Sequence, residues 1–254
     1  MSARVLLILG LGCLPALGTP MLHAEDTAMT GFLNRVHKGA DGKAAKYVVF
    51  VPKDYDAEGD KTYPVIVFLH GKGECVGGKP PVEVGIGPAI KKQQDTFPFI
   101  TAFPRARREW DAGTLDADRA LAILDEVQKE FRTDPKRVYL TGLSLGGGGT
   151  WSLAAKYPER WAAIAPICGF INPRPTTEDC RAIAEKIKGI PCWCFHGEAD
   201  RAVLVEQSRG MMKALWAAGG HPNYTEYPGV EHNSWDQAYA TPELYEWLLK
   251  HQLK

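Results

Sequence analysis

The sequence has no excess of charge of either sign, since 30 Lys and Arg residues balance 30 Asp and Glu residues among 254. It also lacks a basic run or a Lys- or Arg-rich helical face that would neutralise phosphates or hold an anionic membrane. These absences argue against nucleic acid as a partner and against stable membrane insertion.

Internal repeats, low-complexity tracts and Pro/Ser-rich linkers are missing as well. With 45% hydrophobic and 24% charged residues, the composition is that of an ordinary globular chain long enough for one large core. We therefore expect residues 25–254 to fold as one domain.

No apolar run near the start is long enough to span a bilayer. Residues 5–18 form a short apolar segment that follows a positively charged start at residues 1–4. This pattern predicts a secretory signal peptide over residues 1–24 and an exported protein, periplasmic or secreted. Cleavage after Gly18 and after Ala24 both stay open, and lipidation of Cys13 or a buried N-terminal helix are the less favoured interpretations.

Removal of that segment leaves an odd number of cysteines in a compartment that permits disulfides. At least one thiol then has no partner within the chain. Cys168 and Cys180 flank one loop, so the favoured pairing is a bridge between these two. The cysteines concerned are Cys75, Cys168, Cys180, Cys192 and Cys194.

Short apolar runs alternate with helical patterns along the chain. Most of the runs are continuous, which is typical of central strands covered on both faces. This alternation predicts an open, twisted, mostly parallel α/β sheet with helices on both faces. The expected strands are residues 47–51, 65–69, 99–103, 138–140, 163–167, 192–195 and 224–227, and the expected helices are residues 116–131, 147–157, 206–218 and 242–251.

The strongest chemical signal is the segment Gly142-Leu143-Ser144-Leu145-Gly146, which lies between an expected strand and an expected helix. A serine at a sharp strand-to-helix turn needs small neighbours, because adjacent backbone segments approach it closely. We therefore interpret Ser144 as a nucleophile.

A serine hydroxyl needs a base that is oriented by a carboxylate. His232 lies in a loop before the last expected helix, and Asp200 follows a buried-type strand by a few residues. We predict that these two residues are the base and the acid. The weaker candidates are His196, which we expect to support a loop, and His221, His251, Glu198 and Glu206.

Backbone N–H groups that are fixed in advance can stabilise the oxyanion of such a reaction. Leu145 follows the nucleophile, and Lys72 or Gly71 lies in the loop after the strand at residues 65–69. We expect the amides of Leu145 and Lys72 to serve, with His70 shaping the loop. Trp110 and Trp235 are the expected walls of the substrate cleft.

A metal site has to be weighed, because Cys192, Cys194 and His196 share one face of a regular strand. Buried cysteines commonly behave as small apolar residues, and a Ser-His-Asp mechanism needs no metal. We therefore expect neither a metal nor another cofactor.

The chain resembles bacterial esterases related to polyhydroxybutyrate depolymerases, feruloyl esterases and phospholipase/carboxylesterase-like proteins. The resemblance implies the α/β-hydrolase fold, with Ser144 as nucleophile, Asp200 as acid and His232 as base. It covers nearly all of the chain after the signal peptide. The segments that carry it are residues 68–74, 139–144, 166–169, 193–197 and 232–235.

Lys72 replaces the small residue expected in the oxyanion loop, which leads to the hypothesis that it favours substrates with an acidic group. No long insertion lies between Ile167 and Cys192, so we expect no large lid. The expected activity is hydrolysis of short-chain or aromatic acyl esters, small or polysaccharide-linked, through an acyl-enzyme. A serine peptidase of the prolyl-oligopeptidase type and a catalytically inactive binding module are the alternatives.

Overall fold

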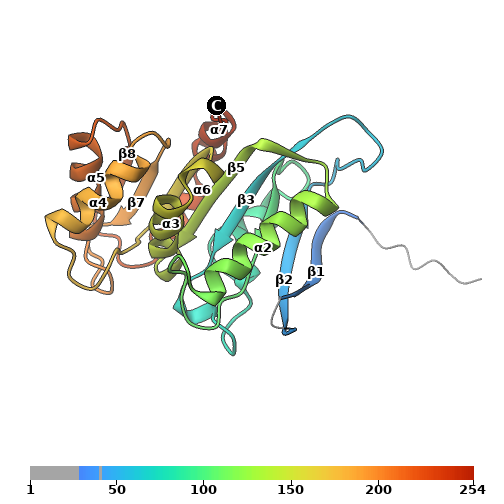
Figure 1. The fold of residues 1–254 in the computed structure, drawn as a ribbon, viewed down its shortest axis with the longest axis horizontal. Coiled ribbons are helices and arrows are strands. Elements are labelled where there is room, and N and C mark those ends of the chain that lie inside the picture. Colours follow the sequence, from blue (N-terminus) through green and yellow to red (C-terminus); the bar gives the residue numbers. More distant parts are fainter. Residues whose placement is uncertain (1–28, 40–41) are drawn as a thin grey trace, which may run out of the picture.

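The computed structural model describes residues 29–39 and 42–254, so the expected signal peptide lies outside the described residues. Eight strands form one sheet in the order β1-β2-β4-β3-β5-β6-β7-β8 (Figure 1). β2 is antiparallel to β1 and to β4, whereas the remaining neighbours run parallel. The strands are β1 (Gly31–Lys38), β2 (Ala44–Val51), β3 (Tyr63–Leu69), β4 (Ile100–Phe103), β5 (Thr133–Leu143), β6 (Ala163–Ile167), β7 (Trp193–Gly197) and β8 (Asn223–Tyr227).

Helices cover both faces of this sheet, because alternate residues of the central strands point into two separate apolar cores. One core joins the sheet to α2 (Leu115–Glu130), α3 (Leu145–Lys156), α4 (Thr177–Ile187) and α5 (Glu206–Ala217). The other joins it to α1 (Ile86–Lys92), α6 (Trp235–Ala240) and α7 (Pro242–Leu249). The expected fold class, an open and mostly parallel sheet between two layers of helices, is confirmed.

Four elements escaped the sequence patterns. β1 is a half-exposed edge strand without a continuous apolar run, and α1 and α6 have only seven and six residues. α4 begins at a capping box formed by Thr176 and Asp179 and packs against α3 and α5. The segment between β6 and β7 therefore extends the helical layer.

The parallel register brings the carboxyl ends of the central strands to one edge. Leu143 of β5 pairs with Ile167 of β6, and Ile167 pairs with Phe195 of β7. The loops that follow these three strands carry Ser144, Cys168 and Asp200 respectively. In an open α/β sheet this edge is where ligands bind.

The expected bridge between Cys168 and Cys180 is wrong. Cys168 belongs to the core that contains α6 and α7, whereas Cys180 on α4 belongs to the core on the opposite face of the sheet. All five cysteines of the described chain carry free thiols. Closeness in sequence across a loop did not bring the two sulfur atoms together, because the loop passes from one face of the sheet to the other.

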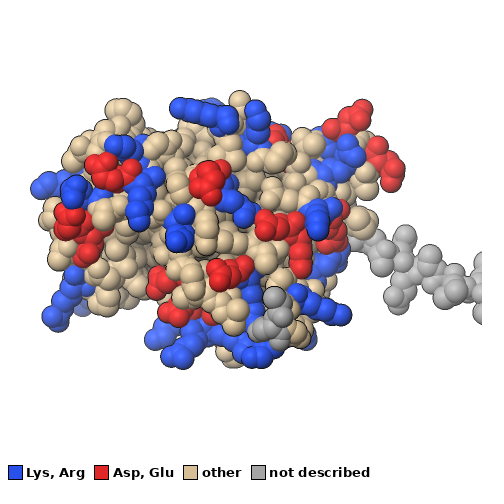
Figure 2. Space-filling model, viewed as in Figure 1, with Lys and Arg blue, Asp and Glu red and all other residues tan. Residues whose placement is uncertain are grey.

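Acidic and basic side chains are interspersed over the face seen in Figure 2, as the balanced composition suggests. Within residues 29–39 and 42–254, no helix is both long and apolar enough to cross a membrane.

Candidate active site

Ser144 occupies a sharp turn between β5 and α3. Its backbone has φ 53° and ψ −114°, which L residues rarely adopt, and its N–H donates to the Ile167 carbonyl at 2.9 Å. A Cβ added to Gly146 would lie 1.9 Å from the Leu69 carbonyl oxygen, and one added to Gly142 would lie 2.4 Å from the Gly146 carbonyl oxygen. Glycine at both positions is therefore a condition for this turn.

Ser144, His232 and Asp200 meet at the carboxyl edge of the sheet. His232 Nε2 lies 2.9 Å from Ser144 Oγ, and His232 Nδ1 lies 2.6 Å from Asp200 Oδ2. An ionised carboxylate only accepts hydrogen bonds, so Nδ1 carries the imidazole proton and Nε2 accepts the hydroxyl proton of Ser144. This tautomer is the one that can remove a proton from serine.

The Asp200 carboxylate is buried and is held from several sides. Its Oδ1 accepts hydrogen bonds from the N–H groups of Ala202 and Val203 at 2.8 and 3.0 Å. Burial alone would raise its pKa, but hydrogen bonds from His196, His232 and the Val203 amide hold that pKa well below its usual range. Asp200 therefore stays ionised at neutral pH and can stabilise a protonated His232.

A second histidine, His196 at the end of β7, supports the loop that carries Asp200. Its Nε2–H donates to the Val203 carbonyl at 2.9 Å and lies 3.3 Å from Asp200 Oδ2. Its Nδ1 accepts from Ser208 Oγ at 2.7 Å, and the Cys194 thiol donates to Ser208 Oγ at 3.3 Å. Sequence reasoning missed Ser208, because only the packing of α5 on the sheet brings it to His196.

Leu145 and Lys72 each begin a helical segment, α3 and the short 3-10 helix Lys72–Glu74. The first N–H groups of a helix have no intrahelical acceptor. Apart from bonds within helices and strands, the N–H groups of Leu145 and Lys72 donate to no backbone carbonyl of the described chain. The N–H of the alternative donor Gly71 is engaged, because it donates to the Glu74 carboxylate and acts against the rise that burial causes in the pKa of Glu74. The two segments follow the neighbouring parallel strands β5 and β3, so the amides of Leu145 and Lys72 both lie at the carboxyl edge of the sheet.

The loop after β3 is fixed by two side chains. Buried His70 donates from Nδ1 to the Gly71 carbonyl at 2.6 Å and accepts at Nε2 from the Ala106 N–H at 3.0 Å. Burial lowers the pKa of His70 to about 4, so the ring is neutral at neutral pH. Arg105, which sequence reasoning missed, donates to the carbonyls of Glu74, Cys75, Gly78 and Lys79 at 2.7 to 3.3 Å.

The two expected cleft tryptophans lie in different environments. Trp235 is half-buried, and its ring meets the His232 ring edge-on with centroids 5.3 Å apart. Trp110 is only 1% exposed, and its indole N–H donates to the His70 carbonyl at 2.9 Å. Trp110 therefore lies in the core behind the loop after β3, which corrects its expected place on a cleft wall. The Lys72 side chain is exposed.

The weaker candidates are engaged elsewhere. Glu198 accepts a hydrogen bond from the backbone N–H of residue 229, and Glu206 pairs with an arginine of its own helix. His221 is exposed, and His251 packs against a tryptophan of α7.

Within the described residues, the side chains of Cys192, Cys194 and His196 do not bring three potential metal-ligand atoms close together. Cys192 is buried in the core shared with α4 and α5, and the Cys194 thiol is directed to Ser208. Within the described chain, the one group of three or more such side chains with potential ligand atoms within 4.8 Å is Cys168, Asp200 and His232.

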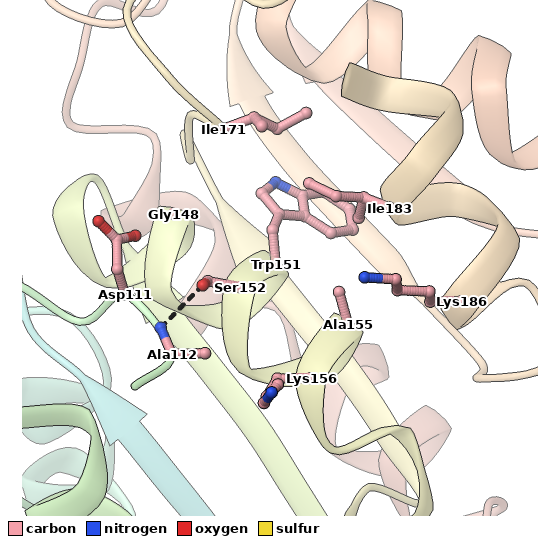
Figure 3. Close-up of a pocket in the computed structure, with 10 residues that line it drawn as sticks. All are labelled: Asp111, Ala112, Gly148, Trp151, Ser152, Ala155, Lys156, Ile171, Ile183 and Lys186. Atoms are coloured by element: carbon pink, nitrogen blue, oxygen red, sulfur yellow. Dashed lines mark hydrogen bonds between the residues drawn. The ribbon is translucent and has the colours of Figure 1, made fainter. Parts of the chain in front are cut away.

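A cavity of about 260 Å³ lies along α3, beginning one helical turn after the serine (Figure 3). Gly148 forms part of its wall, and the Gly148 N–H donates to the Ser144 carbonyl at 3.0 Å. Trp151, Ile171 and Ile183 provide apolar walls. Polar groups lie at its margins, where Figure 3 shows Asp111, Lys156, Lys186 and the hydrogen bond from the Ala112 N–H to Ser152 Oγ at 2.9 Å.

The sheet order, the two helical layers and the Ser-His-Asp geometry define the chain as an α/β-hydrolase. A sequence profile of the family described as "Putative esterase" matches residues 41–246. The chain therefore belongs to this esterase family.

Solved and curated relatives agree with this class and with the resemblance stated above. The crystal structure of a thermostable esterase has a TM-score of 0.72 and 32% identity, and the match covers 87% of this chain and 63% of that one. A "Probable feruloyl esterase C" of Aspergillus flavus is 30% identical over 145 residues, which are 55% of this chain and 50% of its own. Poly(3-hydroxyalkanoate) depolymerase C of Paucimonas lemoignei is 45% identical over 120 residues, 42% of this chain and 28% of its own. The chain spans about half or less of the length of these curated relatives.

Proposed function

We propose that the chain is a serine carboxylesterase in which Ser144 attacks the ester carbonyl. The observation that supports this most directly is the 2.9 Å contact from Ser144 Oγ to His232 Nε2, continued by the 2.6 Å contact from His232 Nδ1 to Asp200. His232 takes the hydroxyl proton as the Oγ–carbon bond forms, and Asp200 stabilises the resulting imidazolium. The N–H groups of Leu145 and Lys72 stabilise the negative charge on the former carbonyl oxygen.

Collapse of this intermediate breaks the bond to the alcohol, which leaves with the proton from His232. A water molecule then gives its proton to His232 and attacks the acyl-enzyme. The acid is released as Ser144 regains a proton. These steps use only side chains and amides of this chain together with substrate and water.

Short-chain or aromatic acyl esters, either small or linked to a polysaccharide, are the proposed substrates. Membership of the esterase family and the relative named for feruloyl esterase activity support this class. The segment between β6 and β7 forms α4, which packs against α3 and α5 within the helical layer. This position supports a site without a large lid, which a bulky alcohol can enter. Export, to the periplasm or out of the cell, is proposed as well, and the sequence pattern of residues 1–24, outside the described residues, supports it.

The function is tested with a fluorophosphonate probe, a panel of nitrophenyl, feruloyl and acetyl-sugar esters, and a proline-containing peptide. We expect the probe to label the wild-type protein and Ser152→Ala but not Ser144→Ala, because Ser152 lies two turns further along α3. Turnover of esters but not of peptides would separate the esterase from a serine peptidase. Correct folding without labelling or turnover would instead support the inactive binding module.

The cavity in Figure 3 is the proposed site for the alcohol part of a bulky substrate. Ala155→Phe should fill it and raise KM for a feruloyl oligosaccharide by about tenfold, equivalent to about 1.4 kcal/mol of lost binding. KM for nitrophenyl acetate should stay unchanged, because its alcohol part does not extend along α3. Ala182→Phe, at an exposed position on α4 outside the cavity, is the matched control. Equal changes for both substrates would contradict this placement.

A further inference from the structure

A buried thiol with no part in the proposed reaction lies beside the Asp200–His232 pair. The Sγ of Cys168, a ring nitrogen of His232 and a carboxylate oxygen of Asp200 lie within 4.8 Å of one another. Cys168 is fully buried and directly follows β6. Its backbone has φ 40°, and its N–H donates to the Phe195 carbonyl at 2.8 Å, so the thiol is presented from a constrained position.

The chemistry of these three donors is that of a site for a thiophilic cation. A thiolate, an imidazole and a carboxylate are the ligand types that Zn²⁺ takes in proteins. Neighbouring ligand atoms in a tetrahedral zinc site lie about 3.5 Å apart, which falls within the 4.8 Å that bounds the separations of these three atoms. The side chain of His232 is 27% exposed, which gives an ion access from the solvent side.

We propose that Cys168, Asp200 and His232 form an inhibitory site for a thiophilic divalent cation such as Zn²⁺. Binding replaces the Cys168 thiol proton, which is released to solvent, by a metal–sulfur bond. The ion also takes the single lone pair that a neutral imidazole offers in its ring plane. If Nε2 binds the ion, its lone pair is occupied, and if Nδ1 binds it, the ring proton moves to Nε2. In both cases His232 no longer accepts the Ser144 proton.

This inference rests on the proposed function only for its activity readout, so the test includes binding without catalysis. Ester hydrolysis is measured against ZnCl₂ for the wild-type protein, Cys168→Ala and Cys168→Ser, each relative to its own uninhibited rate. We expect inhibition that EDTA reverses, and a half-inhibiting zinc concentration at least about tenfold higher in both variants, since changes around metal ligands lower affinity about 10–100-fold. Cys192→Ala, which removes a buried thiol from the opposite core, should retain wild-type sensitivity.

Cadmium provides the second readout through thiolate-to-metal charge-transfer absorption. The Ser144→Ala protein, which cannot turn over ester, should develop this absorption with Cd²⁺, and the additional Cys168→Ala change should abolish it. Zinc inhibition that is unchanged in Cys168→Ala and Cys168→Ser, or absent in the wild type, would overturn the proposal. Cadmium absorption in a protein without esterase activity would instead reject the proposed function and keep the metal site.

Discussion

Replacing Ser144 or His232 with Ala is expected to lower kcat for a nitrophenyl ester on the order of 10⁶-fold, and the double variant should lose no more than either single one. The reason is the shared hydrogen bond at 2.9 Å, because the serine attacks only as the imidazole removes its proton. Once one partner is gone, the other has no further contribution to lose. Steady-state and single-turnover rates of the three variants measure this.

The residual activity is informative as well. Two contributions remain in these variants, the N–H groups that stabilise the oxyanion and the binding of substrate. They should keep ester hydrolysis about 10³–10⁴-fold faster than the uncatalysed reaction in water. His221→Ala, at an exposed position, should keep the wild-type rate and serves as the control. Multiplicative losses in the double variant, with native circular dichroism spectra for all proteins, would show that the two side chains act independently and contradict the proposed mechanism.

Local signals in the sequence predicted much of the sheet and the meeting of three distant residues. The strand expected at residues 163–167 has the same bounds as β6. A short continuous apolar run is a local signal of a buried strand and needs no knowledge of tertiary contacts. Ser144 was located by the glycines that its turn requires, and Asp200 and His232 by their positions after strands. The hydrogen bonds among them then follow from the parallel register.

Other features depend on contacts that leave no trace in a local pattern. Trp110 looks like any aromatic residue in a loop, and only the return of that loop onto His70 buries it. Arg105 fixes the loop after β3 by donating hydrogen bonds to backbone carbonyls. Every residue type has such a carbonyl, so the sequence gives no sign of these contacts. Cys168 and Cys180 follow one another in sequence but belong to opposite cores, so spacing alone gave the wrong pairing.

Acidification from pH 6.5 to pH 4 is expected to remove about 3 kcal/mol from the free energy of unfolding through His70. The pKa of this ring is about 4 in the folded protein against an ordinary value of 6.5 for histidine, because burial opposes the charged form. The unfolded chain therefore binds the proton first as pH falls, so stability is complete above pH 6.5 and lost on the way down to pH 4. Protonation of Nε2 would also destroy the acceptor of the Ala106 N–H.

His70→Gln is the variant that isolates this effect, because an amide offers an acceptor toward residue 106 and does not titrate. Urea unfolding, followed by tryptophan fluorescence between pH 7 and pH 4, should show a shallower fall in stability for this variant than for the wild type. Burial raises the pKa of nearby Glu74 and so contributes with the opposite sign, but this residue is present in both proteins and its effect cancels in the comparison. His221→Gln, an exposed control, should follow the wild-type curve. An identical fall in His70→Gln and the wild type would assign the acid sensitivity to other groups and leave His70 without this role.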